Sequence, residues 1–194
     1  MEWWFWPAIY DRRLTRLADA GAGSSRLTLV TGGARSGKSR YAESLIAALP
    51  PPWVYVATAE PGDAEMAARI AAHRARRSIQ WKIIEAPHAL ADVFSQISAD
   101  APVLVDCLTL WLSNRCLAGA DIDAEVNQLA NALARHAGPV VLVTNEVGSG
   151  IVPDNALARR FRDEQGRLNQ RIAALAGRVV LVVAGLPLIL KGSA

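Results

Sequence analysis

Short aliphatic segments that alternate with longer helical patterns constrain the fold of this chain more than any other feature of its sequence. Four of these segments are nearly continuous aliphatic runs, which is typical of strands that are buried on both faces of a parallel sheet. The strand-like segments lie at residues 27–30, 53–56, 79–84, 103–105, 140–143 and 179–183. The helical patterns lie at residues 38–49, 63–77, 89–97, 121–136 and 156–176. Because this alternation implies right-handed βαβ crossovers, we predict an open, mostly parallel α/β sheet with helices on both faces.

The first 26 residues do not share this alternation. Met1–Tyr10 (MEWWFWPAIY) holds three of the six tryptophans, but its apolar run is shorter than the ~20 residues that span a bilayer. It also lacks the basic start and the long apolar core of a secretory signal. We expect residues 1–26 to be an extension outside the fold, with no membrane span, and residues 27–194 to form a single domain. An interfacial anchor, a tail that docks a partner and a misassigned start are the alternatives.

The charge balance gives little support to a nucleic-acid-binding protein. Lys and Arg number 21 against 18 Asp and Glu, which leaves a formal net charge of +3. Only three of the basic residues are lysines, and the chain has no basic stripe of the kind that follows a nucleic-acid backbone. The two cysteines match neither a disulfide framework nor a zinc site. We therefore expect no nucleic-acid partner, and the reducing cytoplasm as the compartment.

A glycine-rich segment directly follows the first predicted strand and precedes the first predicted helix. It reads TGGARSGKS from Thr31 to Ser39 and fits the pattern G-x-x-x-x-G-K-[ST] in the strand–loop–helix context that the pattern requires. In such a loop, successive main-chain N–H groups converge on phosphate oxygens at the positive end of a helix. Lys38 would reach the β- and γ-phosphates of a nucleoside triphosphate, and the Ser39 hydroxyl would ligate Mg²⁺. The segment predicts a RecA-like P-loop NTPase; a glycine loop that only turns the chain is the alternative.

An aspartate follows another aliphatic strand, at a place where P-loop enzymes hold a metal ion. Val103–Asp106 (VLVD) ends in a carboxylate that would bind Mg²⁺ directly or through water. The alternative role for Asp106, capping the helix that would begin after it, is compatible with this one. Cys107 has no histidine or other base beside it, so we expect a small buried packing residue there rather than a nucleophile.

One predicted helix carries a histidine among arginines. Within residues 63–77, Arg69, His73 and Arg76 fall in an arc of about 60°, and the alanines lie away from that arc. Neighbouring cations favour the neutral imidazole, which is a competent nucleophile toward a nucleotide α-phosphate. The guanidinium groups would hold the phosphates. A solvated basic helix with an incidental histidine is the alternative.

Four segments together resemble one enzyme family. TGGARSGKSRYAE, AEMAARIAAHRARR and VLVDCLTLWLSN are joined by VTNEVGSGIVPDNALARRFRDEQGRLNQRIA, which is far more restricted than a P-loop. From about Leu27 to Gly185 the chain resembles the bifunctional adenosylcobinamide kinase/adenosylcobinamide-phosphate guanylyltransferases of cobalamin synthesis. The resemblance implies that a nucleoside triphosphate phosphorylates adenosylcobinamide. It further implies that GMP from GTP passes through a histidine to the phosphorylated corrinoid, which releases pyrophosphate and gives adenosylcobinamide-GDP.

The resemblance also implies roles for individual residues. His73 would form the GMP-histidine intermediate and Lys38 would take part in catalysis, with ATP and GTP as substrates and Mg²⁺ at Ser39 and Asp106. The implied partners are adenosylcobinamide, its phosphate and further copies of the chain, often in a trimer. The implied nucleotide contacts are Gly32, Gly33, Ala34, Arg35, Ser36, Gly37, Lys38, Ser39, Ala57, Thr58, Ala59, Arg74, Ala75, Arg76, Arg77, Glu85 and Asp106.

Two other functions and two unassigned segments remain. Some relatives carry adjacent histidines where this chain has Ala72–His73, so a P-loop small-molecule kinase without the transferase step is one alternative. A RecA-like ATPase that acts on DNA is another, although the scarcity of lysine speaks against it.

We expect residues 144–150, which follow a predicted strand, to shape a ligand pocket or a subunit contact. Five arginines on the next helix form either a solvated face or a phosphate clamp for a neighbouring subunit: Arg159, Arg160, Arg162, Arg167 and Arg171.

Overall fold

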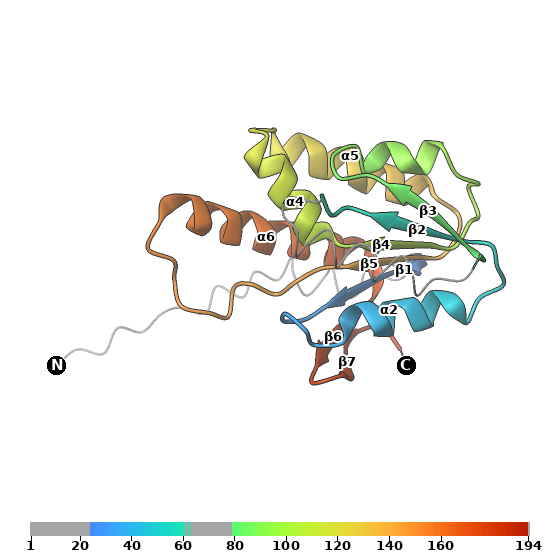
Figure 1. Ribbon diagram of the computed structural model, residues 1–194. Helices are drawn as coiled ribbons and strands as arrows, with labels where there is room; N and C mark the ends of the chain where they lie inside the picture. The colour runs from blue at the N-terminus through green and yellow to red at the C-terminus, as the bar shows by residue number, and fades with distance from the viewer. Residues whose placement is uncertain (1–23, 61, 63–78, 194) are drawn as a thin grey trace, which may run out of the picture.

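The computed structural model describes residues 24–60, 62 and 79–193, and within them it shows one seven-stranded sheet flanked by helices (Figure 1). The strands are β1 (Ser24–Thr31), β2 (Trp53–Ala57), β3 (Trp81–Glu85), β4 (Val103–Asp106), β5 (Val140–Val143), β6 (Ala176–Val183) and β7 (Leu186–Lys191). The helices are α2 (Lys38–Ala47), α4 (Leu108–Leu117), α5 (Ile122–Arg135) and α6 (Ala156–Leu175), with the 3₁₀ helix η1 (Ala91–Ser95) before β4.

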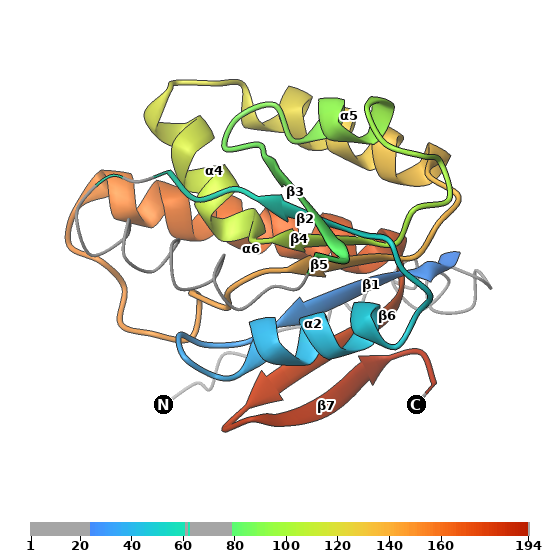
Figure 2. The same ribbon diagram turned by 45° about the vertical axis from the view of Figure 1, so that its right-hand side comes forward.

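The order of the strands brings the ends of β1, β5 and β4 together. The sheet runs β3-β2-β4-β5-β1-β6-β7, and every neighbouring pair is parallel except β6 and β7 (Figure 2). In register, Val143 lies beside Val30 of β1 on one side and beside Asp106 of β4 on the other. Because parallel strands end at the same edge, whatever follows these three strands is gathered in one place. The predicted open, mostly parallel α/β sheet is confirmed.

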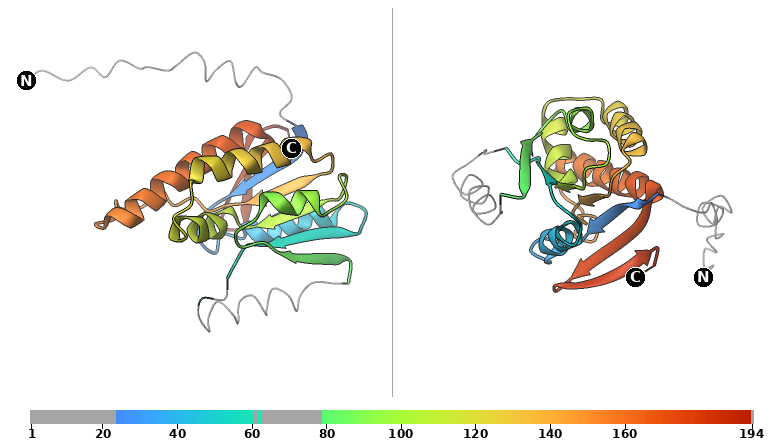
Figure 3. Two further views of the ribbon diagram at one scale, coloured as in Figure 1. Left: turned by 90° about the horizontal axis from the view of Figure 1, so that it is seen from above. Right: turned by 90° about the vertical axis from the view of Figure 1, so that its right-hand side faces the viewer.

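Helices cover both faces of the sheet (Figure 3). α2 lies on one face, where its Ala42 and Ile46 are fully buried against strand side chains such as Val143. η1, α4, α5 and α6 cover the opposite face, where Leu129 of α5 and Leu29 of β1 belong to a larger buried cluster. The central strands, such as β4 and β5, are therefore buried on both sides, which is why their sequences are continuously aliphatic rather than alternating.

Side-chain caps define where two of the covering helices begin. The Asp121 carboxylate accepts the N–H of Ala124 at 3.1 Å ahead of α5, and the Asn155 amide oxygen accepts that of Ala158 at 2.7 Å ahead of α6. Each cap satisfies one of the donors that the first turn of a helix leaves unpaired. The apolar residues of α5 recur at helical spacing, so they form one buried face: Ile122, Val126, Leu129 and Leu133.

The start of the sheet differs from the sequence prediction. β1 begins at Ser24, which pairs with Ala176 of β6, so residues 24–26, assigned from the sequence to the extension, are strand residues here. Arg26 then fastens this end of β1, because its Nη1 donates to the carbonyl of Ala137 at 2.9 Å.

Two other elements also differ from the prediction. The helix expected over residues 89–97 is only the 3₁₀ helix η1, in which the Ser95 hydroxyl donates to the Asp92 carbonyl and competes with helical hydrogen bonding. β7 was not predicted, because its Pro187 speaks against a strand except at an edge, which is where β7 lies. The helix predicted over residues 63–77 lies outside the described residues. Across the described ranges, no helix combines the length and the apolar character needed to cross a membrane.

We expect the buried face of α5 to dominate its contribution to stability. Leu129 is fully buried, and Leu129→Ala should lower the free energy of unfolding by about 2–5 kcal/mol, since it removes buried methyl groups and leaves a cavity. The same change at Leu117, which is 74% exposed at the end of α4, should cost less than about 0.5 kcal/mol. Urea denaturation of both variants measures the difference. Equal losses would contradict the assignment of these faces.

Candidate active site

The loop between β1 and α2 lies at the sheet edge where the parallel strands end. Ser36 N–H donates to the Gly33 carbonyl at 3.3 Å, which turns the loop back on itself, and Tyr41 N–H donates to the Gly37 carbonyl at 3.0 Å to begin α2. A bond from the neighbouring hairpin holds the loop from the side, because Gly185 N–H donates to the Ser36 carbonyl at 2.8 Å. The first N–H groups of a helix have no partner within it, so this loop can offer donors to an anion.

Glycine is required at both ends of this loop. A Cβ built on Gly32 would lie 2.4 Å from the main-chain carbonyl oxygen of Val182, which cannot move aside without disturbing β6. Gly37 adopts a left-handed φ of 96°, and a Cβ there would approach the Cα of Gly185 to 3.2 Å. The two glycines of the sequence pattern therefore let the loop pack closely against the β6–β7 turn.

Lys38 and Ser39 occupy the first turn of α2. Lys38 is buried, with a relative exposure of 9%, and its Nζ donates to the Gly33 carbonyl at 3.1 Å. This bond folds the ammonium group back across the loop, where it would meet the phosphates of a bound nucleotide. The loop residues Ala34 and Arg35 are exposed at its outer rim.

Asp106 lies directly beside the loop, as the sequence predicts. Its Oδ1 is 3.4 Å from the Ser39 hydroxyl, and its Oδ2 accepts from the Tyr55 hydroxyl at 3.1 Å. A hydroxyl beside a carboxylate is a suitable donor pair for Mg²⁺, which takes one or two protein oxygens and completes its shell with water and phosphate. Among residues 24–60, 62 and 79–193, no group of three His, Cys, Asp or Glu side chains could hold a metal ion by itself.

The predicted nucleotide contacts of β2 and β3 reach the same edge. Ala57 pairs with both Asp106 and Glu85, so the last residues of these three strands are level. Thr58 is fully buried, and its hydroxyl donates to the Cys107 carbonyl at 2.7 Å and accepts the Cys107 N–H at 2.8 Å. Thr58 thus ties the end of β2 to the end of β4 and supports the position of Asp106. Glu85 is exposed at the end of β3.

A buried polar network holds the segment that follows β5. The Thr144 hydroxyl donates to the Asn169 amide oxygen at 2.7 Å and accepts from Gln165 Nε2 at 3.0 Å, and both amides belong to α6. Thr144 and Gln165 are both fully buried. Asn169 Nδ2 in turn donates to the Asn145 carbonyl at 3.0 Å. Residues 144–150 were predicted from the sequence, but their α6 partners were not. The signal for these partners is a pair of amides four residues apart, on a helix face that also carries the buried Leu168 and Ile172.

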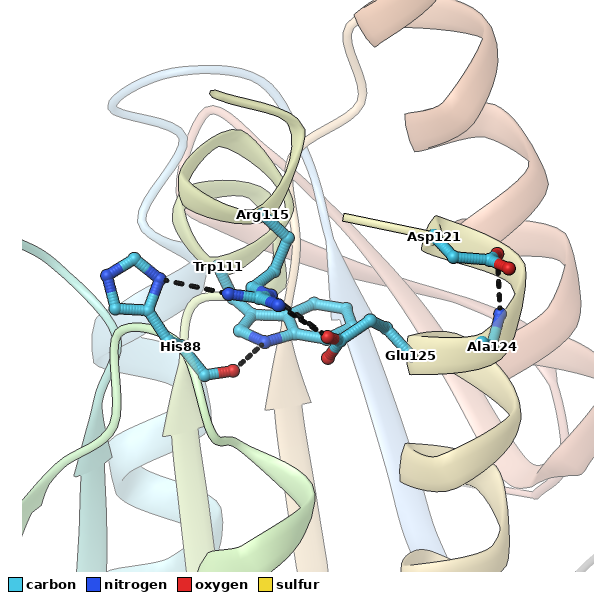
Figure 4. A network of polar contacts seen from close by, with 6 residues as sticks. All are labelled: His88, Trp111, Arg115, Asp121, Ala124 and Glu125. Atoms are coloured by element: carbon cyan, nitrogen blue, oxygen red, sulfur yellow. Dashed lines mark hydrogen bonds and ion pairs between the residues drawn. The ribbon is translucent and has the colours of Figure 1, made fainter. Parts of the chain in front are cut away.

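A second network connects α4, α5 and the loop after β3 (Figure 4). Arg115 bonds Glu125 at 2.6 Å and approaches His88 Nδ1 at 3.4 Å, while His88 Nε2 lies 2.8 Å from Glu60. Trp111 Nε1 donates to the His88 carbonyl at 2.9 Å. Glu60, which stands shortly before the segment that carries His73, is thereby connected to the helical layer.

Several predicted site residues lie outside the described part of the chain. They belong to the segment 63–78, and they are His73, Arg74, Ala75, Arg76 and Arg77. The described residues therefore bring together the glycine loop, Lys38, Ser39, Asp106 and the ends of β2 and β3, and the residues predicted for guanylyl transfer lie outside them.

The chain is similar to known proteins over most of its length. The family model for cobinamide kinase / cobinamide phosphate guanyltransferase matches residues 28–190. The chain belongs to this family. It is 49% identical over 167 residues to the bifunctional adenosylcobalamin biosynthesis protein CobP of Pseudomonas aeruginosa, with 84% of this chain and 96% of that protein covered. It is 44% identical over 181 residues to CobU of Salmonella typhimurium, which bears the same description, with 85% and 99% covered.

A solved structure supports the fold alone. An ATPase from the type III secretion system of pathogenic bacteria superposes with a TM-score of 0.52 at 10% identity, over 81% of this chain and 51% of that one. This likeness and the strand–loop–helix geometry confirm the predicted P-loop NTPase fold.

The two cysteines differ in how deeply they are buried. Burial raises the pKa of the Cys107 thiol to about 11, and the adjacent Asp106 charge adds to the effect, so its thiolate is scarce at neutral pH. Burial also raises the pKa of Cys116, although this residue is only partly buried on α4. These properties support the expectation that Cys107 is a packing residue, because the thiolate is the reactive form.

We predict that Cys107 is inert in the folded protein. In a Cys116→Ser variant at pH 8, an aromatic disulfide reagent should modify no thiol until the protein is unfolded. Because the folded pKa is raised, unfolded Cys107 loses its proton first, so the free energy of unfolding should also decrease between about pH 9 and pH 11. Wild-type protein serves as the control, with Cys116 reacting first. Rapid native-state modification of the variant would contradict the burial of Cys107.

Proposed function

We propose that this chain phosphorylates adenosylcobinamide with ATP or GTP and then transfers GMP from GTP to the product, which gives adenosylcobinamide-GDP and pyrophosphate. The observation that carries the proposal is the pairing of Lys38 across the loop with Ser39 beside Asp106, in a chain whose family performs both reactions by name. This arrangement supports triphosphate binding, and the match to nearly the full length of two bifunctional relatives supports the substrate.

For the kinase step, the glycine loop would cradle the phosphates and Lys38 would neutralise charge on the β- and γ-phosphates. Ser39 and Asp106 would hold Mg²⁺, which when bound supplies positive charge beside the phosphate oxygens. Tyr55 and Thr58 fix Asp106 from two sides, since one bonds its carboxylate and the other bonds the next residue. These contacts keep the carboxylate in place before the nucleotide arrives.

For the transferase step, we propose His73 as the nucleophile. An imidazole nitrogen would attack the α-phosphorus of GTP while the bond to the bridging oxygen breaks and pyrophosphate leaves. A phosphate oxygen of the phosphorylated corrinoid would then attack the same phosphorus, and the histidine would depart. Arg74–Arg77, which lie next to His73 in the sequence, would contact the nucleotide as the family resemblance implies.

We also propose that the protein forms a homo-oligomer, with a trimer as the expected form. An apolar surface on the β6–β7 hairpin supports association. Four of its side chains are more than half exposed, with relative exposures of 56–72%: Val183, Leu186, Leu188 and Leu190. Apolar surface of this kind is typical of contact faces.

Labelling distinguishes the bifunctional enzyme from a kinase without the transferase step. With GTP radiolabelled at the α-phosphate, the wild-type protein should acquire covalent label that is labile in acid and stable in base, as a phosphorus–nitrogen bond is. His73→Ala should lose that label by at least about 100-fold because it removes the nucleophile. His88→Gln, which changes the histidine that contacts Glu60, should keep the covalent label. Phosphorylation of cobinamide without any label on wild-type protein would favour the kinase alone.

A further inference from the structure

Asn145 stands immediately beyond β5, at the centre of the proposed active-site edge. β5 lies between β1, which leads into the glycine loop, and β4, which ends at Asp106. Val143 is level with Asp106, so Asn145 projects about 7 Å further along the strand direction. This places it between the phosphate-binding loop and the acidic residue, over the region where the transferred phosphoryl group would lie.

The main chain around Asn145 is held on every side. Thr144 N–H donates to the Val30 carbonyl at 3.0 Å and Glu146 N–H donates to the Gly32 carbonyl at 3.2 Å, which continues the parallel ladder past the end of β5. Asn145 N–H donates to the Thr109 hydroxyl at 2.8 Å, and its carbonyl accepts from Asn169 at 3.0 Å. The residue is therefore fixed by β1, α4 and α6 at once.

The side chain of Asn145 contrasts with this fully bonded backbone. Its Oδ1 is buried and has no hydrogen-bond partner. Three other buried oxygens also lack a partner, those of Thr31 at the end of β1, Ser36 in the glycine loop and Gln165 in the Thr144 network. A buried amide oxygen without a donor is unfavourable, so a rigidly held residue with such an acceptor is suited to bind a donor group from outside the chain.

The alternation of side chains indicates which way this acceptor faces. Thr144 contacts α6, and the ladder that continues through Glu146 keeps the backbone extended. Successive side chains of an extended strand point to opposite faces, so Asn145 is directed to the face of the sheet on which α2 and the glycine loop begin. That face is the one from which Lys38 and Ser39 would reach the phosphates.

Resting on the proposed kinase function, we propose that Asn145 is a further catalytic residue whose Oδ1 accepts a hydrogen bond from the alcohol hydroxyl that receives the phosphoryl group. Phosphate oxygens are acceptors and cannot satisfy an amide oxygen, whereas a substrate hydroxyl is a donor. The bond orients the hydroxyl oxygen toward the γ-phosphorus, which is the contribution that positioning makes to phosphoryl transfer.

The step balances without a proton acceptor on Asn145. The hydroxyl oxygen forms a bond to the γ-phosphorus while the bond from that phosphorus to the bridging oxygen breaks, and the nucleoside diphosphate leaves. The hydroxyl proton passes to a non-bridging oxygen of the transferred phosphoryl group. Throughout, the neutral Asn145 amide keeps the hydroxyl oxygen oriented toward the γ-phosphorus and does not change its own protonation.

The guanylyl-transfer step gives an internal control, because neither of its nucleophiles is an alcohol. Asn145→Ala should lower kcat for phosphorylation of cobinamide by about 30- to 100-fold, with the KM for nucleotide changed less than about threefold. The same protein should still incorporate label from the α-phosphate of GTP within about threefold of wild type. Asn131→Ala, an exposed asparagine on α5, should behave as wild type in both assays.

Asn145→Asp tests the acceptor oxygen separately from the amide nitrogen. Aspartate keeps an acceptor oxygen in the same place, so at saturating nucleotide its kcat should be at least about fivefold above that of Asn145→Ala, although the added charge should raise the KM for nucleotide. An Asn145→Ala enzyme that phosphorylates cobinamide at the wild-type rate would overturn the proposal, and so would an aspartate variant no faster than the alanine one. A wild-type protein that neither phosphorylates cobinamide nor takes up label would instead contradict the proposed function.

Discussion

The close contact between the glycine loop and the β6–β7 turn fixes the position of the loop that would bind a nucleotide. Gly32 lies against the Val182 carbonyl, and Gly185 N–H bonds the Ser36 carbonyl at 2.8 Å. With the loop fixed on that side, its remaining N–H groups and the start of α2 are available to phosphate. Lys38, Ser39 and Asp106 take their positions from this loop and from the neighbouring strand end. The antiparallel strand β7 has no predicted site residue. It is important because the β6–β7 turn supports the glycine loop.

Buried polar side chains hold the ends of the parallel strands in place. The Thr58 hydroxyl bonds both the N–H and the carbonyl of Cys107, at the junction of β4 and α4. Thr144, Gln165 and Asn169 do the same for the end of β5 with a buried hydroxyl and two amides. Buried polar groups of this kind are favourable only when they are bonded, so each network specifies one arrangement of the edge. Two buried amide oxygens of this region, Asn145 Oδ1 and Gln165 Oε1, remain without a hydrogen-bond partner.

Much of the fold and part of the site followed from local sequence signals. The aliphatic runs around Val103 and Val140 indicated central parallel strands because burial on both faces leaves no polar position. The glycine loop and Asp106 were predictable because phosphate binding demands particular residues at fixed spacing. Gln165 and Asn169 were not, since a polar pair on a helix looks like surface until its tertiary partner is known. β7 was missed for a similar reason, because only its place at the sheet edge makes Pro187 acceptable.

Both proposed reactions depend on Lys38, folded over the glycine loop, to bind the triphosphate they share. Calorimetric titration with a non-hydrolysable GTP analogue and Mg²⁺ tests it most directly, on Lys38→Met beside Lys82→Met, which removes an exposed lysine of β3. Loss of a charged hydrogen bond predicts at least about tenfold weaker binding for Lys38→Met, together with loss of both activities, and unchanged binding for Lys82→Met. Wild-type affinity and turnover in the Lys38→Met protein would show that Lys38 does not bind the triphosphate.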